Sequence, residues 1–153
     1  MKNSFLIILI IFYQILFFDK VDAKEIQFDA SDIEISNDQN LTVANNGIAI
    51  IKNDGLIIKG VKIQYFKDKS LIVVNEGEIS KIDKTLKINS NFIEYYIDTG
   101  KINFSNKVKI NDYANNLVIK TKNIKYDIIN QLVVGQDKTK ILDEFDNTYK
   151  VDE

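Results

Sequence analysis

The chain has 153 residues, a formal net charge of −2 and no His, Cys, Pro or Trp. Without His or Cys it has no thiol nucleophile, no imidazole base and no ordinary zinc, haem or iron–sulfur ligands, which excludes most enzyme chemistry. All twenty basic residues are Lys, so the guanidinium groups that read guanine are missing and a sequence-specific nucleic-acid reader is disfavoured.

The first 23 residues have the pattern of a signal peptide. A positively charged start precedes an apolar stretch from Phe5 to Phe18, which as a helix would span about 21 Å, short of a bilayer core. Small residues at Val21 and Ala23 predict cleavage between Ala23 and Lys24. We expect an exported chain with residues 24–153 as one domain; an uncleaved inner-membrane anchor is the alternative.

The exported part is built from a repeat. Four similar blocks begin at Ile26, Leu56, Leu86 and Leu117. Each block carries two apolar pairs whose members are two residues apart. In pairs such as Ile33/Ile35, Ile63/Tyr65 and Ile124/Tyr126 the residue between the members is polar, which is the period-two pattern of a strand with one buried face. The pairs are Ile33/Ile35, Leu41/Val43, Ile63/Tyr65, Leu71/Val73, Ile93/Tyr95, Ile102/Phe104, Ile124/Tyr126 and Leu132/Val134.

Polar residues that suit tight turns separate these strands. Turns are expected at Asn45-Asn46-Gly47, Asn53-Asp54-Gly55, Asn75-Glu76-Gly77 and Asn115-Asn116. Strands of about five residues without intervening helices favour antiparallel pairing. We therefore predict an all-β, elongated, antiparallel jelly roll or solenoid that is open and built from repeats, with a compact closed barrel as the weaker alternative.

Two segments carry a resemblance to a known family. The stretches Gly55–Tyr65 and Leu117–Asp127 each contain a short strand that runs into an Ile-x-Tyr strand. This sequence pattern resembles that of the organic-solvent-tolerance (OstA-like) family, which includes the periplasmic bridge protein LptA and the N-terminal domain of the outer-membrane protein LptD. The resemblance covers about Phe28 to Val134 and implies a jelly roll of V-shaped strands that carries lipopolysaccharide across the periplasm.

The resemblance implies an apolar groove that shields lipid A acyl chains, without a catalytic residue, metal or cofactor. Methylene groups in water cost about 0.8 kcal/mol each, so an apolar groove is the minimal carrier. We predict a lining of Ile35, Val43, Ile50, Ile63, Tyr65, Val73, Ile93, Tyr95, Ile102, Phe104, Ile124, Tyr126 and Leu132. The alternative is that these side chains pack on one another as a closed core, because a register error of one residue reverses every side chain.

The resemblance also implies partners. Open jelly rolls leave edge strands that can pair with other jelly-roll proteins of a transport bridge, unless charges such as Lys138 and Lys140 blunt the edge. The alternation that begins near Tyr149 favours an LptD-like N-terminal domain, outer-membrane associated, over an LptA-like bridge protein, and both remain open.

Other patterns have simpler explanations. The carboxylates Asp29 and Asp32, and the group Asp143, Glu144 and Asp146, suit solvated turns better than glycoside hydrolysis or calcium binding. Lysines that alternate with apolar residues, as at Lys109 and Lys120, are expected on the wet face of a strand, or else near phosphates and sugars of a lipid. Two other function classes remain: a structural or adhesive β-solenoid that binds no lipid, and a carboxylate-dependent polysaccharide enzyme.

Overall fold

The computed structural model describes residues 24–135, 137–143, 145 and 147–151, so the predicted signal peptide and its cleavage after Ala23 lie outside the described residues. The described residues form ten strands and two short 3₁₀ turns, η1 (Lys52–Asp54) and η2 (Lys67–Lys69). The strands are β1 (Ile26–Ile35), β2 (Leu41–Ile51), β3 (Leu56–Phe66), β4 (Leu71–Lys81), β5 (Leu86–Tyr96), β6 (Lys101–Asp112), β7 (Leu117–Asp127), β8 (Leu132–Gly135), β9 (Thr139–Leu142) and β10 (Thr148–Val151). No helix in the described part of the chain is long and apolar enough to cross a membrane.

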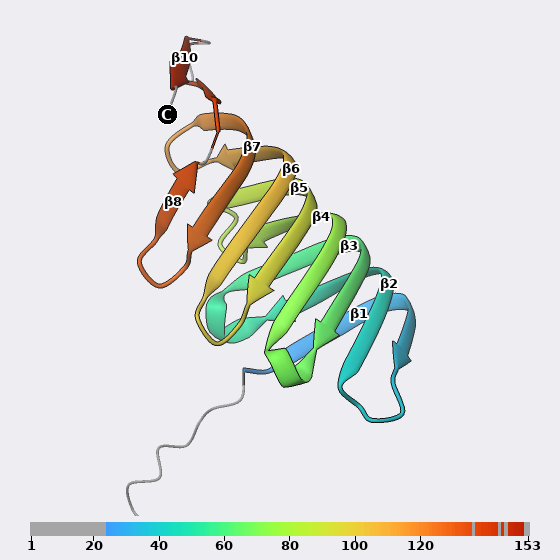
Figure 1. Cartoon of the computed structure of the whole chain (residues 1–153). Coiled ribbons are helices and arrows are strands. Elements are labelled where there is room, and N and C mark those ends of the chain that lie inside the picture. The colour runs from blue at the N-terminus through green and yellow to red at the C-terminus, as the bar shows by residue number, and fades with distance from the viewer. Residues whose placement is uncertain (1–23, 136, 144, 146, 152–153) are drawn as a thin grey trace, which may run out of the picture.

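The strands form one antiparallel sheet in which each strand from β1 to β7 pairs with the next along the chain. At the C-terminal end the sheet divides, because β8 pairs with one half of β7 and β9 pairs with the other half, followed by β10. Figure 1 shows the strands stacked along the long direction of the molecule. This arrangement confirms the predicted all-β, open, antiparallel jelly roll.

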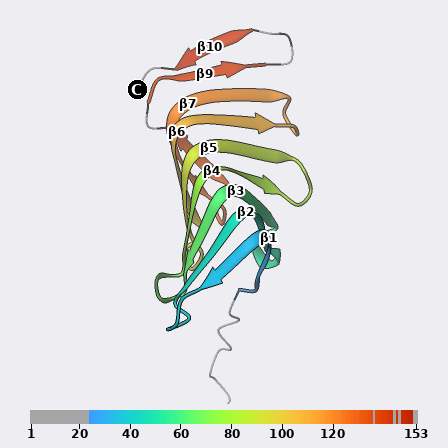
Figure 2. The same ribbon diagram turned by 90° about the vertical axis from the view of Figure 1, so that its right-hand side faces the viewer.

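Each long strand bends near its middle, which gives the sheet two legs (Figure 2). Leg 1 contains residues 26–30, 47–51, 56–60, 77–81, 86–90, 108–112 and 117–121, continued by β9 and β10. Leg 2 contains residues 32–35, 41–45, 62–66, 71–75, 92–96, 101–105 and 123–127, continued by β8. The inner faces of the legs point toward each other: Phe28 of leg 1 lies 6.4 Å from Tyr65 of leg 2, between ring centroids.

The bends correct two predicted turns and the predicted strand length. Asn45-Asn46-Gly47 and Asn75-Glu76-Gly77 lie inside β2 and β4, where Asn46 and Glu76 adopt φ of 48° and 47°. A left-handed residue suits a tight turn and a strand bend alike, so the residue types alone did not separate them. The strands from β1 to β7 are therefore 10 to 12 residues long rather than about five.

The other predicted features of the repeat are confirmed. Asn53-Asp54-Gly55 and Asn115-Asn116 connect consecutive strands, and Gly55 has φ of 65°. The four repeat starts coincide with the first residues of β1, β3, β5 and β7. One repeat is thus a pair of bent strands.

Small residues line the bend where the strands pair. Gly47, Gly60 and Gly77 lie opposite one another on β2, β3 and β4. A Cβ atom on Gly60 would lie 2.3 Å from Cγ1 of Val74, and one on Gly77 would lie 2.5 Å from the backbone oxygen of Lys59. Glycine is required here by the close approach of neighbouring atoms.

Candidate functional site

The inner face between the two legs carries the apolar residues of the fold. On leg 2 two cross-strand rows face inward: Ala44, Ile63, Val74, Ile93, Phe104 and Ile124 form one, and Tyr65, Ile72, Tyr95, Ile102 and Tyr126 form the other. On leg 1 the matching row is Ala49, Ile58, Ile79, Ile88, Ile110 and Ile119. These rows form one hydrophobic cluster, so the inner face is the candidate site for an apolar ligand.

Nine of the thirteen predicted lining residues lie on the inner rows of leg 2. They are Ile35, Ile63, Tyr65, Ile93, Tyr95, Ile102, Phe104, Ile124 and Tyr126. All except Tyr65 and Ile35 are buried, and Ile35, at the free edge, is 62% exposed. On this leg the residues of the Ile-x-Tyr and Ile-x-Phe pattern lie on the inner face, and their contact with a lipid stays a prediction.

The other four predicted residues lie on the outer face. Val43, Ile50, Val73 and Leu132 each follow or precede a residue that points inward, namely Ala44, Ala49, Val74 and Val133. Segments such as Leu71-Ile72-Val73-Val74 are apolar throughout, so alternation does not select a face, and a shift of one residue exchanges the two faces.

Sequence reasoning also missed the inner face of leg 1, which holds none of the thirteen predicted residues. Ile58, Ile79, Ile88 and Ile110 are buried there, at exposures of 3% or less. Ile88 and Ile110 each stand between a Lys and an Asn, in Lys87-Ile88-Asn89 and Lys109-Ile110-Asn111. That alternation is the signal that could have found them.

From β2 to β5 the inner face is filled by the protein's own side chains. Ile58, Ile63, Ile72, Val74, Ile93 and Tyr95 have no exposed surface. A packed interior of this kind leaves no empty volume for a lipid chain unless the legs separate. In this region the interior corresponds to the closed core that we considered as the alternative to a groove.

The inner face opens at the C-terminal end, where the sheet divides. A cavity of about 310 Å³ lies there, near the lower end of typical ligand pockets. Its apolar lining comes from both legs and consists of Ile110, Ile119, Ile124, Val133, Ile141 and Val151. A second cavity of about 290 Å³ is lined by Leu86, Ala114 and Tyr126 and also by Val133, which lines both cavities. We call the first one the C-terminal cavity.

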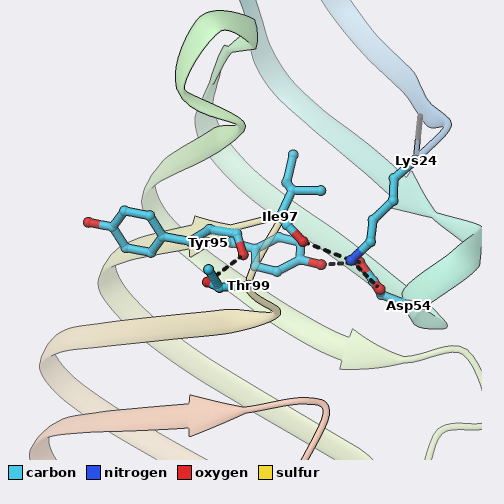
Figure 3. Close-up of polar contacts among 6 residues, drawn as sticks. Lys24, Asp54, Tyr95, Ile97 and Thr99 are labelled. Atoms are coloured by element: carbon cyan, nitrogen blue, oxygen red, sulfur yellow. Dashed lines mark hydrogen bonds and ion pairs between the residues drawn. The ribbon is translucent and has the colours of Figure 1, made fainter. Parts of the chain in front are cut away.

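A polar cluster joins the two legs near the C-terminal end of β5 (Figure 3). The Lys24 Nζ donates to Asp54 Oδ1 at 2.8 Å and to the Ile97 carbonyl oxygen at 2.7 Å, and the Tyr95 hydroxyl donates to Asp54. Asp54 lies in η1, which follows the leg 1 half of β2, whereas Tyr95 and Ile97 lie at the leg 2 end of β5, so this clasp joins the legs. Burial, followed by the hydrogen bond to Asp54 and its negative charge, raises the pKa of the Tyr95 hydroxyl well above its usual range.

Several acidic residues of the described chain accept hydrogen bonds within turns. Asp143 accepts hydrogen bonds from the backbone N–H groups of Phe145 and Asn147, and Asp29 and Asp32 are exposed. Within the described ranges no group of three or more Asp, Glu, His or Cys residues is placed to hold a metal ion.

The geometry defines a class: an open antiparallel jelly roll of bent strands with an apolar interior. Among solved structures the chain is similar to LptH, described as the LptA-homologous periplasmic component of the conserved lipopolysaccharide transport device of Pseudomonas aeruginosa, with a TM-score of 0.66 over 85% of this chain and 96% of that one. The two sequences are 13% identical, so the likeness shows a shared fold. No protein-family model matches the chain, and no curated protein does. The predicted resemblance is confirmed as a fold of the LptA type.

Proposed function

We propose that this chain is a periplasmic carrier domain that binds lipopolysaccharide and shields its acyl chains on the inner face between the legs. The observation that carries the proposal is the C-terminal cavity, an apolar opening into an otherwise packed interior. The fold shared with LptH, whose description names a lipopolysaccharide transport device, supports the same function.

The physical requirement is met by the residues of the cavity. An acyl chain that leaves water gains about 0.8 kcal/mol for each buried methylene group, and six aliphatic side chains provide the contact. Neither a nucleophile nor a cofactor is needed for such binding. We propose that an acyl chain enters at β7–β9, and that it reaches the inner rows of β2–β5 when the legs separate.

The matched test uses two adjacent residues of β8. Val133 faces the cavity and Val134 faces outward, and their exposed fractions are similar, at 39% and 46%. A photo-reactive amino acid at each position, in cells that make lipopolysaccharide, compares the faces at equal accessibility. Crosslinks from position 133 and few from position 134 support the proposal. Equal crosslinking from both positions, or none from position 133, contradicts it.

One observation favours a second function. The complete packing of the interior from β2 to β5 is what a structural or adhesive β-solenoid requires, because such a protein needs a stable stack and no ligand. This candidate predicts that lipopolysaccharide leaves the inner face unchanged, so the same crosslinking experiment separates the two functions.

We also propose that the chain docks end to end with other jelly-roll proteins. In the described sheet β1 pairs only with β2, and β10 pairs only with β9, so one side of each strand has no partner strand. Such edges accept an added strand through backbone hydrogen bonds. Light scattering over a range of concentrations tests self-docking: a mass that rises with concentration supports it, and a constant monomer mass contradicts it.

A further inference from the structure

A row of four lysines crosses the outer face of leg 1 at the C-terminal end. Lys109 on β6 pairs with Lys120 on β7, Lys120 pairs with Lys140 on β9, and Lys140 pairs with Lys150 on β10. All four side chains are exposed. Their inner neighbours Ile110, Ile119 and Ile141 line the C-terminal cavity, which fixes the outward direction of the lysines. We call this row the lysine ladder.

No residue of the lysine ladder forms an ion pair in the part of the chain that the structure describes. The ion pairs found there join Lys24 to Asp54 and Lys87 to Glu78, and neither involves a residue of the ladder. Directly opposed residues on neighbouring strands lie about 5 Å apart, and like charges in that position repel one another. An ordinary solvated strand face avoids this repulsion by alternating the sign of its charges.

The earlier part of the same cross-strand row shows the contrast. Lys59 on β3 pairs with Glu78 on β4, and Glu78 pairs with Asn89 on β5 and accepts a hydrogen bond from its side chain at 3.1 Å. Burial works against ionisation of Glu78, but hydrogen bonds from Lys87 and Asn89 hold the pKa of its carboxyl below the usual range. This part of the row is internally neutralised, whereas the lysine ladder is not.

We propose that the lysine ladder docks the C-terminal end of leg 1 on an anionic lipid bilayer. Four strands about 4.8 Å apart present the ammonium groups along one line, on an exposed sheet face. Lysine is a flexible point charge that suits a surface of many mobile phosphates better than one rigid bidentate ligand. Membrane docking of this kind is independent of whether the interior binds a lipid chain.

The bilayer is favoured over an acidic protein by the extent of the positive surface. Lys107, Lys122 and Lys138 are also exposed on β6, β7 and the segment before β9, so the charge extends beyond a single line. A continuous anionic surface contacts all of these groups at once, and each lysine near such a surface adds to the attraction. The apolar residues of the cavity remain on the opposite face of the same strands.

Sedimentation with vesicles tests the proposal. The chain is mixed with vesicles of phosphatidylcholine alone and with vesicles that also contain the anionic lipid phosphatidylglycerol. We expect binding to the anionic vesicles only, with a loss of affinity as the salt concentration rises. Replacement of all four ladder lysines, K109Q, K120Q, K140Q and K150Q, should weaken binding by about a hundredfold or more.

A variant with the same net charge serves as the control. Lys52, Lys62, Lys67 and Lys101 are exposed lysines outside the ladder, and their replacement by Gln removes the same four charges. This variant should retain most of the binding. The proposal is overturned if the control loses as much affinity as the ladder variant, if the wild-type chain binds neutral vesicles equally, or if it binds no vesicles. The salt dependence of the wild-type chain tests the electrostatic origin without relying on any variant.

Discussion

The two ends of the stack differ in how their apolar inner faces are packed. From β2 to β5 the two legs press their apolar faces together, the bend is lined by glycines, and a clasp of Lys24, Asp54 and Tyr95 joins the ends of the legs. After β7 the sheet divides, and a cavity of about 310 Å³ remains between the legs. The same repeat thus builds a closed core at one end and an accessible apolar surface at the other.

The difference shows that an apolar inner face is not by itself a binding groove. A side chain such as Ile63 has no exposed surface and stabilises the fold, whereas Val133 on the equivalent face is 39% exposed and open to a ligand. The first contributes to the free energy of unfolding, and the second is available for binding. The following predictions test this division, beginning with the largest effect.

The sharpest contrast comes from one substitution made at both ends. Ile63→Ala removes a side chain from the closed core and should lower the free energy of unfolding by about 2–5 kcal/mol. Ile141→Ala, at a half-buried residue beside the cavity, should cost about 1 kcal/mol. Denaturant unfolding of both variants measures the difference. Equal costs would mean that the two ends are packed alike.

The bend should tolerate a methyl group only at the open end. Gly77→Ala places a Cβ atom 2.5 Å from the Lys59 backbone oxygen, and the resulting overpacking should cost about 1–3 kcal/mol. The control is Gly135→Ala in β8, where the nearest atom is the Thr139 Oγ1 at 3.2 Å and the cost should be smaller. Denaturant midpoints of the two variants measure these costs. A Gly77→Ala variant as stable as the wild-type chain would show that the strands do not approach as closely as described.

The clasp should contribute less than the core. Tyr95→Phe removes the hydroxyl that donates to Asp54 but leaves the ring buried, so we expect the free energy of unfolding to fall by about 1–2 kcal/mol. Tyr96→Phe, at the exposed neighbouring residue, is the control and should have little effect. A double-mutant cycle of Tyr95→Phe with Lys24→Met measures the coupling through Asp54. The absence of any coupling would argue against a clasp between the legs.

Acid should weaken turns at both ends of the stack. Hydrogen bonds hold the pKa of four turn carboxyls below the usual 3.8. Asp38 accepts from the Ser36 side chain, and Asp83 accepts from the Thr85 backbone. Asp127 accepts from the Asn130 backbone, and Asp143 accepts from the Asn147 side chain. Since the folded values are lower than the unfolded ones, this stabilisation is complete above about pH 5 and is lost as the pH falls through the folded pKa values.

Hydrogen exchange across this pH range compares the two ends. The β9–β10 hairpin contains the Asp143 turn and has little core beneath it, so its amides should lose protection before those of β2–β5, after correction for intrinsic exchange rates. A stability that increases on acidification below pH 3.8 would contradict the direction of the pKa shifts.

The sequence predicted the architecture better than it predicted the faces. The repeat starts at Ile26, Leu56, Leu86 and Leu117 coincide with strand starts because each pair of bent strands repeats the same apolar and turn residues. The bends were missed because Asn46 and Glu76 also suit hairpin turns. Each bend in β2 and β4 changes which alternate residues face inward, so a single period-two pattern does not extend along a whole strand.

The site was predictable only where polar residues flank the apolar ones. Ile63 and Tyr65 stand beside Lys62 and Gln64, and both lie on an inner row; Val73 stands between Ile72 and Val74, and it faces outward. The clasp was beyond sequence reasoning, because Lys24 and Tyr95 lie 30 and 41 residues from Asp54 and meet it only when the legs close. The C-terminal cavity likewise depends on where the sheet divides.

The central claim is that the inner face of the C-terminal end binds acyl chains. The chain has no cysteine, so a single introduced one can be labelled specifically with a polarity-sensitive fluorophore. Ile141→Cys places the label on the cavity wall, and Leu142→Cys places it on the outer face of the same strand. On titration with lipopolysaccharide, we predict a saturable blue shift at position 141 and a much smaller change at position 142. An unchanged spectrum at position 141, or equal shifts at both positions, would contradict the account.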